Sequence, residues 1–352
     1  MGLRRFRVLL ASLSLLLMAG LPASPARASS KVEGVPAFGN TFVIIGENTE
    51  LIEINKRSTP YLLNRLKPQS AWFTRYFALS HFSTSNYIGM TSGQYTPCHQ
   101  FDYPPSRCHQ DVNNLFNQLD GVNTSWTEWN ESMPVPCAVT NAGSSKTLNH
   151  YAVKHNPAVY YDNVEGAGGV WSADPTLQSD ECKQNVISTG GTGPNDMSAF
   201  DAAVGAGDVS KFNYIIPNEC EDAHDTCQPN PPSALGQFDD FLEREVPQIL
   251  ALPAFDPGGD GVLIITFDEG TSTTGGGGSN GSVPCEAWMT CPNAFHGGGN
   301  VALLVISPLA KTGVYSVTNN HYGLLRTLED GFGITTYVGG AGSANPINSI
   351  WK

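Results

Sequence analysis

Four places in the chain carry side chains that could bind a divalent cation. Two of them, Glu47-Asn48 and Asp268-Glu269, each follow an apolar stretch. The other two are Asp222-Ala223-His224, in a polar turn, and His321, at the start of an amphipathic segment. Carboxylate, amide and imidazole groups are ligands of divalent metals. One acidic residue at a strand end is more often a solvated turn or a helix cap, so a metal site requires that these places meet in space.

A group of hydroxyls precedes a helix that we expect over residues 86–92. Ser83, Thr84 and Ser85 lie in the stretch S-H-F-S-T-S-N-Y at residues 80–87. Free backbone amides and the helix dipole make a helix N-terminus favourable for an anion. The hydroxyls could instead simply cap the helix. Beside a divalent cation, a hydroxyl in this position would suit phosphoryl transfer.

Apolar strands and amphipathic helices alternate along the chain and would position these groups. We expect strands at 42–46, 71–79, 125–129, 212–216, 261–267 and 300–307, and helices from 59, at 86–92, 112–119 and 235–250, and from 321. This alternation predicts an α/β fold with a doubly wound, mainly parallel sheet and helices on both faces. In such sheets ligands bind at the carboxyl ends of the strands. Residues 130–210 look irregular, and a region of that length often covers an active site.

The stretch from Met1 to Ala28 resembles an export signal. Three arginines precede the apolar run 8–19, and Ala26-Arg27-Ala28 provides small residues for cleavage. Residues 29–352 are expected to form one domain that is secreted. The signal is short for a membrane span, and no later stretch reaches the roughly 20 apolar residues that a span needs, so we expect no stable membrane anchor.

The chain is acidic, with 19 Lys and Arg against 32 Asp and Glu. Loss of the four arginines in the signal would bring the net charge to about −17. Such a surface repels nucleic acid and anionic lipid at long range, which excludes a nucleic-acid partner. A phosphate-bearing substrate would then be attracted locally, by metal ions or by a few placed cations. No protein partner can be inferred.

Eight cysteines in an exported chain favour disulfides. Three pairs are close in the sequence, namely Cys98 with Cys108, Cys220 with Cys227, and Cys285 with Cys291, which leaves Cys137 and Cys182. No C-x-x-C spacing occurs, which argues against a zinc site built from cysteines.

In their order along the chain, these motifs resemble the bacterial phosphoesterase family of the alkaline-phosphatase superfamily, which holds secreted acid phosphatases and phospholipases C. The resemblance extends over about residues 40–335. It is carried by Glu47-Asn48, H-F-S-T-S-N-Y, Lys154-His155, Pro217-Asn218 with D-A-H-D, F-D-E-G and H-Y-G-L-L-R-T-L-E-D. The short length is most similar to actinobacterial secreted acid phosphatases. The fold implied is alkaline-phosphatase-like.

The resemblance also implies roles for individual residues. Ser83 would be the nucleophile, with Thr84 as the alternative. Glu47, Asn48, Asp268 and Glu269 would hold one divalent metal, and Asp222, His224 and His321 would complete a second site where two metals are bound. The substrate phosphate would be contacted by Lys154, His155 and Asn86.

Two departures from the family pattern stand out. Members commonly read H-P-S-x-P-N-Y, whereas this chain has Phe82 and Ser85 in place of the two prolines. The usual N-D-M-H-D is changed to Glu221-Asp222-Ala223-His224-Asp225, between Cys220 and Cys227. The added carboxylate and a neighbouring disulfide could alter metal preference or access of the substrate.

The expected function is a secreted, metal-dependent phosphoric monoester hydrolase that works through a phosphoserine, with one or two divalent ions. The substrate would be a small phosphate ester or a phospholipid headgroup. A phosphodiesterase of the phospholipase C type is the first alternative. The second is a non-catalytic exported protein whose acidic residues bind a structural cation.

Overall fold

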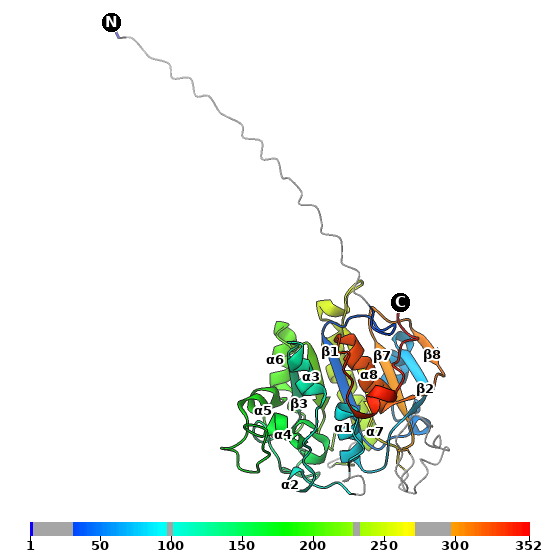
Figure 1. Ribbon diagram of the computed structural model, residues 1–352. Coiled ribbons are helices and arrows are strands. Elements are labelled where there is room, and N and C mark those ends of the chain that lie inside the picture. The colour runs from blue at the N-terminus through cyan, green and yellow to red at the C-terminus, as the bar shows by residue number, and fades with distance from the viewer. Residues whose placement is uncertain (3–30, 97–100, 228–232, 272–296) are drawn as a thin grey trace.

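The computed structural model describes residues 1–2, 31–96, 101–227, 233–271 and 297–352 (Figure 1). The expected export signal therefore lies almost wholly outside the described residues, as do Cys98, Cys285 and Cys291.

Within the described residues, nine strands form one sheet in the order β4-β3-β5-β1-β6-β7-β2-β8, with β9 beside β2. β7 is antiparallel to β6 and β2, and the other strand pairs are parallel. The strands are β1 (Thr41–Gly46), β2 (Ala71–Phe77), β3 (Trp126–Asn130), β4 (Val186–Ser188), β5 (Phe212–Ile216), β6 (Val262–Phe267), β7 (Asn300–Ile306), β8 (Gly313–Tyr315) and β9 (Asn319–Asn320). The predicted mainly parallel α/β sheet is confirmed.

Helices cover both faces of the sheet. They are α1 (Ser83–Ser92), α2 (Pro105–Cys108), α3 (Leu115–Gly121), α4 (Asp162–Glu165), α5 (Asp180–Asn185), α6 (Ser198–Ala206), α7 (Ala234–Leu250) and α8 (His321–Gly331). α1 and α8 contact each other on the face turned toward the viewer in Figure 1, and α7 lies on the opposite face. α7 has a strongly amphipathic sequence and buries Phe238, Leu242 and Ile249, as its periodicity predicts.

Two regions differ from the sequence-based expectation. α1 begins at Ser83 rather than at residue 86, so the three hydroxyls form its first turn. Residues 130–210 are not simply irregular, because they contain α4, α5, β4 and α6. These elements are short, and β4 has only three residues at the edge of the sheet. Their hydrophobic periodicity is therefore too brief to recognise in the sequence.

Two disulfides connect described cysteines. Cys220 is bonded to Cys227, as the close spacing predicts. Cys137 is bonded to Cys182, the two cysteines left over from the near-neighbour pairs, and this bond ties the segment after β3 to α5. Among the described residues, no helix is both long enough and apolar enough to cross a membrane.

Acidic residues directly follow the two central strands β1 and β6. Every residue of β1 and β6 is buried, and the two strands run parallel with Gly46 opposite Phe267. Both strands therefore end at the same level. The residues that follow them, Glu47 and Asp268, are fully buried although they are acidic. Buried carboxylates need hydrogen bonds, protons or cations, so this edge is where a functional site should be sought.

Candidate active site

The ends of β1 and β6 bring two predicted ligand pairs together. The Asn48 backbone N–H donates to Asp268 Oδ1 at 3.2 Å, and the Thr49 N–H donates to the Glu269 carbonyl at 2.9 Å. Glu47 and Asp268 are fully buried, and Glu269 is only 4% exposed. Parallel pairing of adjacent strands therefore places four candidate ligands side by side although about 220 residues separate them in the chain.

Ser83 faces this acidic group from the first turn of α1. Its Oγ donates to Glu47 Oε2 at 2.9 Å and lies 3.5 Å from Glu269 Oε1. Tyr87, one turn further along α1, donates its hydroxyl to the other oxygen of Glu47. The backbone N–H of Thr84 instead donates to Asp102 Oδ1 at 3.0 Å. Of the competing hydroxyls, Ser83 is thus the one bonded to the predicted metal ligands.

The turn before α1 has a strained residue. Phe82 has φ +82°, a region that residues with a side chain rarely adopt. Its N–H donates to Glu269 Oε2 at 3.0 Å, and His81 Nδ1 lies 2.8 Å from the same oxygen. Proline could not occupy this conformation, because its ring fixes φ at a negative value and removes the N–H. This chain lacks the family's usual proline at residue 82, and the turn has a backbone conformation that proline could not adopt.

Asn86 supports this turn rather than facing the cavity. Its Oδ1 accepts from the N–H groups of Leu79 and Ser80 at 3.0 and 3.2 Å, and its Nδ2 donates to the Ser80 carbonyl at 2.7 Å. Its amide is engaged on both sides and fully buried. The sequence predicted that Asn86 contacts the substrate phosphate. In the structure, its side chain instead holds the backbone that precedes Ser83.

His155 lies among the acidic ligands instead of beside a substrate. Its Nε2 is 3.2 Å from Glu47 Oε2, and its Nδ1 is 3.3 Å from Asp222 Oδ2. Ligand atoms of these three fully or nearly fully buried residues lie within 4.8 Å of one another. His155 is thus a third candidate metal ligand between Glu47 and Asp222, and its contact with a substrate phosphate stays a prediction.

Asp222 and His224 contact different side chains. Ala223 between them has φ +86°, and the His224 N–H donates to Asp222 Oδ1 at 2.8 Å. His224 Nδ1 contacts Asp225 Oδ1 at 2.9 Å, whereas its Nε2 lies 3.3 Å from Lys154 Nζ. Asp222 Oδ2 instead faces His155, and the shared ion that the sequence spacing suggested stays a prediction.

His321 lies behind the acidic group. Its Nε2 is 2.7 Å from the backbone carbonyl of Asp268, and its Nδ1 is 2.8 Å from the hydroxyl of Tyr76. Both ring nitrogens are thus engaged, and the side chain is fully buried. In place of the expected metal ligation, His321 fixes the turn that carries Asp268.

The donor atoms at the centre of the site fit a divalent cation. Several of them are buried and have no hydrogen-bond partner: Asn48 Oδ1, Asp268 Oδ2, Asp222 Oδ2 and His155 Nε2. Such orphaned acceptors are rare in folded proteins. Oxygen donors with one imidazole suit divalent metals from Mg²⁺ or Mn²⁺ to Zn²⁺. The residues present are therefore compatible with the metal that the sequence predicts.

Burial dominates the electrostatics of this group. It raises the pKa of Glu47 to about 7, although Lys154 and His224 act in the opposite direction. Burial also raises the pKa values of Asp222, Asp268 and Glu269 well above their usual range, and neighbouring carboxylates add to the effect. A cluster of carboxylates out of water is costly to ionise without positive charge, and a bound divalent cation would supply that charge.

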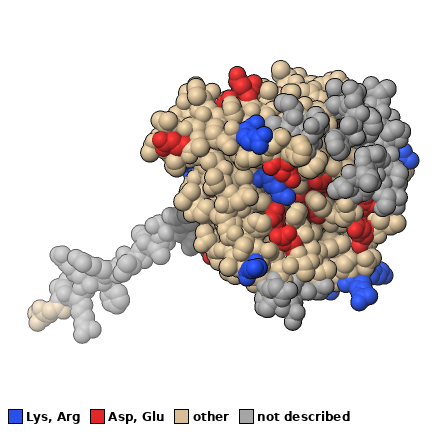
Figure 2. All heavy atoms as spheres, turned by 90° about the horizontal axis from the view of Figure 1, so that it is seen from below, with Lys and Arg blue, Asp and Glu red and all other residues tan. Residues whose placement is uncertain are grey.

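A cavity of about 230 Å³ opens above Ser83. Among the residues that line it are Asn48, His81, Ser83, Asp102, Lys154, His224 and Glu269. Figure 2, which views the molecule from below, shows acidic side chains gathered around basic ones near the middle of this face. The cavity therefore combines a hydroxyl at a helix N-terminus, carboxylates and a lysine.

Lys154 and Asp102 face each other across this cavity. Lys154 Nζ lies 3.3 Å from Glu219 Oε1 and 3.8 Å from Asp102 Oδ2. Lys154 lines the cavity, and its contact with a substrate phosphate stays a prediction. Asp102 was not anticipated, because it lies in a polar loop with no recognisable motif. The only hint in the sequence was that this loop follows the hydroxyl-bearing helix directly.

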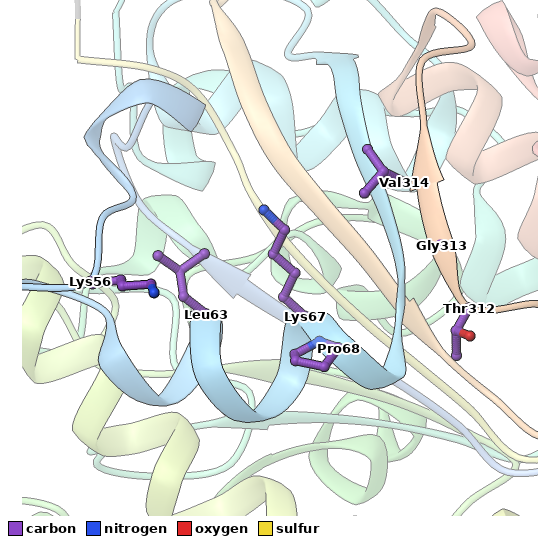
Figure 3. A pocket seen from close by; sticks show the side chains of 7 residues that line it. All are labelled: Lys56, Leu63, Lys67, Pro68, Thr312, Gly313 and Val314. Carbon is purple, nitrogen blue, oxygen red and sulfur yellow. The ribbon is translucent and has the colours of Figure 1, made fainter.

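A larger hollow, of about 500 Å³, lies elsewhere on the molecule (Figure 3). It is lined by Lys56, Leu63, Lys67, Pro68, Thr312, Gly313 and Val314. It offers neither a carboxylate nor a catalytic nucleophile, and Lys67 Nζ lies over the ring of Trp72, 4.6 Å from its centroid. Size alone thus does not mark the site of chemistry, whereas the converging polar groups above Ser83 do.

Residues 37–335 match the model of a known protein family, whose description is "Phosphoesterase family". The chain belongs to this family. The match includes every residue of the site described above. It confirms the resemblance inferred from the order of the motifs.

Several family relatives are named as phosphatases. The phosphatidylinositol-3-phosphatase of Mycobacterium tuberculosis is 25% identical over 322 residues, which span 90% of this chain and 84% of the relative. A probable acid phosphatase of Kluyveromyces lactis is 28% identical over 64% of this chain, and an acid phosphatase of Aspergillus fumigatus is 27% identical over 61%. The aligned regions span 48% and 43% of these two fungal proteins.

Solved structures support the fold. A Vibrio parahaemolyticus protein of the alkaline phosphatase superfamily superposes with a TM-score of 0.50 at 12% identity, over 87% of this chain and 69% of that one. A protein from Bacteroides thetaiotaomicron, described in connection with glycosaminoglycan metabolism, gives a TM-score of 0.54 at 13% identity, over 89% and 81%. At such low identity the similarity shows the fold alone.

Proposed function

We propose that the protein is an exported, metal-dependent phosphoric monoester hydrolase with Ser83 as its nucleophile. The observation that carries this proposal is the position of Ser83 Oγ, 2.9 Å from Glu47 Oε2 at the N-terminus of α1. A hydroxyl held there faces a cavity that also contains Lys154. These are the parts that transfer of a phosphoryl group to a serine requires.

The chain's own residues account for the steps of the reaction. Lys154 and the N-terminus of α1 bind and orient the phosphate oxygens. Ser83 Oγ forms a bond to phosphorus while its proton passes along the hydrogen bond to the Glu47 carboxylate. The ester oxygen leaves with its electron pair and takes up a proton from solvent. Water then cleaves the phosphoserine, which releases inorganic phosphate and restores the serine hydroxyl.

A divalent cation would be held by Glu47, Asn48, Asp268 and Glu269, with Asp222 and His155 as further donors. When bound, it would supply positive charge that favours the ionised serine and the phosphate oxygens. His81 and Phe82 would keep Glu269 in place through their contacts with its Oε2. His321 would do the same for the turn at Asp268.

The relatives support a monoester rather than a diester as the substrate. The mycobacterial relative, which aligns along most of both chains, is named for removal of a phosphate monoester from a phosphoinositide. The fungal relatives are named acid phosphatases. We therefore propose a phosphomonoester, either a small molecule or a lipid headgroup, as the substrate class.

The test compares Ser83→Ala with Thr84→Ser in the mature protein, supplied with a divalent metal and an aryl phosphate. Loss of Ser83 should lower kcat by at least about a thousandfold, because no other hydroxyl in the described part of the chain is bonded to both Glu47 and Glu269. Thr84→Ser keeps a hydroxyl at the neighbouring position and should retain most of the activity. Full activity of Ser83→Ala would refute the mechanism.

The same assay separates the remaining alternatives. Release of a phosphorylated headgroup from a diester, with no inorganic phosphate from monoesters, would indicate a phosphodiesterase. Absence of turnover on both substrate classes, together with a metal-dependent rise in the melting temperature, would indicate a non-catalytic cation-binding protein.

A further inference from the structure

A second cluster of potential metal ligands lies beside the active-site cavity. It consists of His150, Glu219, His224 and Asp225, here called the rim cluster. Ligand atoms of His150, Glu219 and Asp225 lie within 4.8 Å of one another. It is separate from the buried group of Glu47, His155 and Asp222, although the rings of His155 and His224 are only 6.1 Å apart.

Imidazole and carboxylate groups contact each other throughout the rim cluster. His150 Nδ1 contacts Glu219 Oε2 and lies 3.2 Å from Asp225 Oδ2. His224 Nδ1 lies 2.9 Å from Asp225 Oδ1 and 3.9 Å from Glu219 Oε1. Each carboxylate therefore lies near both imidazoles, and one nitrogen and two carboxylates come close enough together to share one ion. The nitrogen and carboxylate donors present are of the kinds that bind Zn²⁺.

The backbone holds these side chains in place. The Glu219 N–H donates to the His150 carbonyl at 3.0 Å, and the Asp225 N–H donates to the Glu219 carbonyl at 2.7 Å. The disulfide between Cys220 and Cys227 closes the loop that carries His224 and Asp225, and Glu219 directly precedes this loop. The donors thus come from a constrained scaffold, and little ordering would be needed when an ion binds.

Charge and burial distinguish the rim cluster from an ordinary surface ion pair. The Glu219 side chain is 4% exposed, and those of His150, His224 and Asp225 are about a quarter exposed, at 27%, 27% and 26%. The cation that the structure places against Glu219 besides the two imidazoles is Lys154, at 3.3 Å, and Lys154 also reaches toward Asp102. The cluster is therefore shielded enough to select its ligand and open enough for an ion to enter.

We propose that His150, Glu219 and Asp225 form a second metal site, with His224 available as a fourth ligand, which takes a divalent transition metal of the Zn²⁺ class. Imidazole nitrogen with carboxylate oxygen favours Zn²⁺ and its neighbours over Mg²⁺ or Ca²⁺. Any proton on a ligating Nδ1 is released to solvent when the ion binds. His224 would join through Nδ1, which already faces Asp225, while its Nε2 stays on the side of Lys154.

The site has a consequence for the surrounding face. A divalent ion there would add positive charge next to a cavity that Lys154 and His224 both line. In a chain with 32 acidic and 19 basic residues, local positive charge is scarce. The ion would also join the segment before Lys154 to the loop after β5, two parts of the chain that are far apart in the sequence.

The experiment counts metal ions. The mature protein is stripped with a chelator and titrated with Zn²⁺ by calorimetry, and bound zinc is measured by elemental analysis. We expect His150→Gln and Asp225→Asn each to lose one equivalent of zinc that Glu47→Gln retains. Substitution with Co²⁺ gives a second readout, because His150→Gln should remove one set of visible absorption bands that Glu47→Gln leaves in place.

His109→Gln is the matched control. His109 Nδ1 also contacts a carboxylate, Asp162 Oδ1 at 2.7 Å, but no third ligand joins them in the described residues. This variant should bind zinc like the parent. Unchanged zinc stoichiometry in both His150→Gln and Asp225→Asn, with the melting temperatures confirming that they are folded, would overturn the proposal. Since the readout is bound metal, it holds whether or not the protein hydrolyses phosphoesters.

Discussion

At the residue scale, Asp102 lies where an incoming phosphate would have to bind. Its Oδ1 accepts from the Thr84 N–H at the N-terminus of α1, and its Oδ2 is 3.8 Å from Lys154 Nζ. A helix N-terminus and a lysine are the two groups that should attract the substrate. A carboxylate of the protein itself occupies this position and must give way when a phosphate enters.

This geometry predicts that Asp102→Asn binds phosphate more tightly. Asparagine can still accept from the Thr84 N–H, but it no longer repels an anion, which is worth about 1 kcal/mol at short range in a solvated site. KM for an aryl phosphate and the inhibition constant of inorganic phosphate should therefore fall by about fivefold. Asp208→Asn, an exposed residue beyond α6, is the control for net charge. A rise in both constants would show that Asp102 instead positions Lys154.

Glu128 should make the stability of the protein depend on pH. Burial raises its pKa to about 8, although the Asn130 side chain and the Ala158 N–H both donate to it. Its pKa is raised above the ordinary value of 4.5, so its contribution is fully present below about pH 4.5. As the pH rises toward 8, the unfolded chain ionises this group while the folded chain keeps it neutral. The free energy of unfolding then falls by up to about 1.4 kcal/mol per pH unit.

Glu128→Gln should remove that dependence, because its side chain is neutral at every pH. Urea unfolding at pH 5 and pH 8 should show a smaller loss of stability in this variant than in the parent protein. Glu243→Gln, at an exposed position on α7, should behave like the parent protein. Equal losses in the parent and in Glu128→Gln would show that Glu128 is ionised in the folded state.

At the scale of elements, the turn that joins β2 to α1 determines where the nucleophile points. The sequence departs from the family pattern here, and the φ of Phe82 explains how the chain manages without proline. Three groups converge on this turn: Glu269 accepts the Phe82 N–H, His81 contacts the same carboxylate, and Asn86 fixes the preceding backbone. The turn that positions Ser83 is therefore held in place by contacts with side chains of the candidate active site.

Phe82→Pro is expected to destabilise the protein by about 3 kcal/mol or more. Proline cannot adopt the positive φ of Phe82 and lacks the N–H that Glu269 accepts. Phe82→Gly, the matched variant, keeps the N–H and adopts positive φ without strain, so its loss should be limited to side-chain packing, which includes the ring contact with Phe101. Midpoints of urea unfolding measure both effects. A Phe82→Pro variant as stable as the parent would mean that the turn can assume the family's usual conformation.

At the scale of the whole molecule, the sheet gathers buried negative charge that the fold cannot neutralise by itself. Glu47, Asp222, Asp268 and Glu269 come from three different strand ends, and burial raises the pKa of each. The stability of the sheet should therefore be linked to metal binding. This linkage extends through β1, β5 and β6 at the centre of the structure.

Removal of divalent ions with a chelator should lower the melting temperature. A ligand present at 100 times its dissociation constant stabilises the native state by about 2.7 kcal/mol, which corresponds to a shift of several degrees in a protein of this size. Adding back the metal should restore the original value. The chelator should shift the melting temperature of Glu47→Gln less than that of the parent protein. If the chelator left the melting temperature of the parent protein unchanged, a metal in the centre of the site would be contradicted.

The sequence by itself determined six of the nine strands in the described residues, the polar ends of the central ones and the presence of a helix beside the hydroxyls. Strand periodicity and apolar runs depend on local burial, so residues 212–216 were predicted with the bounds that the structure shows. Because parallel strands end at one edge, the proximity of Glu47-Asn48 and Asp268-Glu269 also followed from the sequence. The order of the motifs was sufficient to infer the family.

Only the tertiary structure decided which side chains meet. Neighbouring side chains find different partners: Asp222 faces His155, whereas His224 contacts Asp225 and Lys154. Both ring nitrogens of His321 contact other groups, the Asp268 carbonyl and the Tyr76 hydroxyl. Asp102, from a loop without a recognisable motif, accepts a hydrogen bond from the first turn of α1. These contacts depend on turn dihedrals and on packing between segments far apart in the chain, which residue types and spacing do not encode.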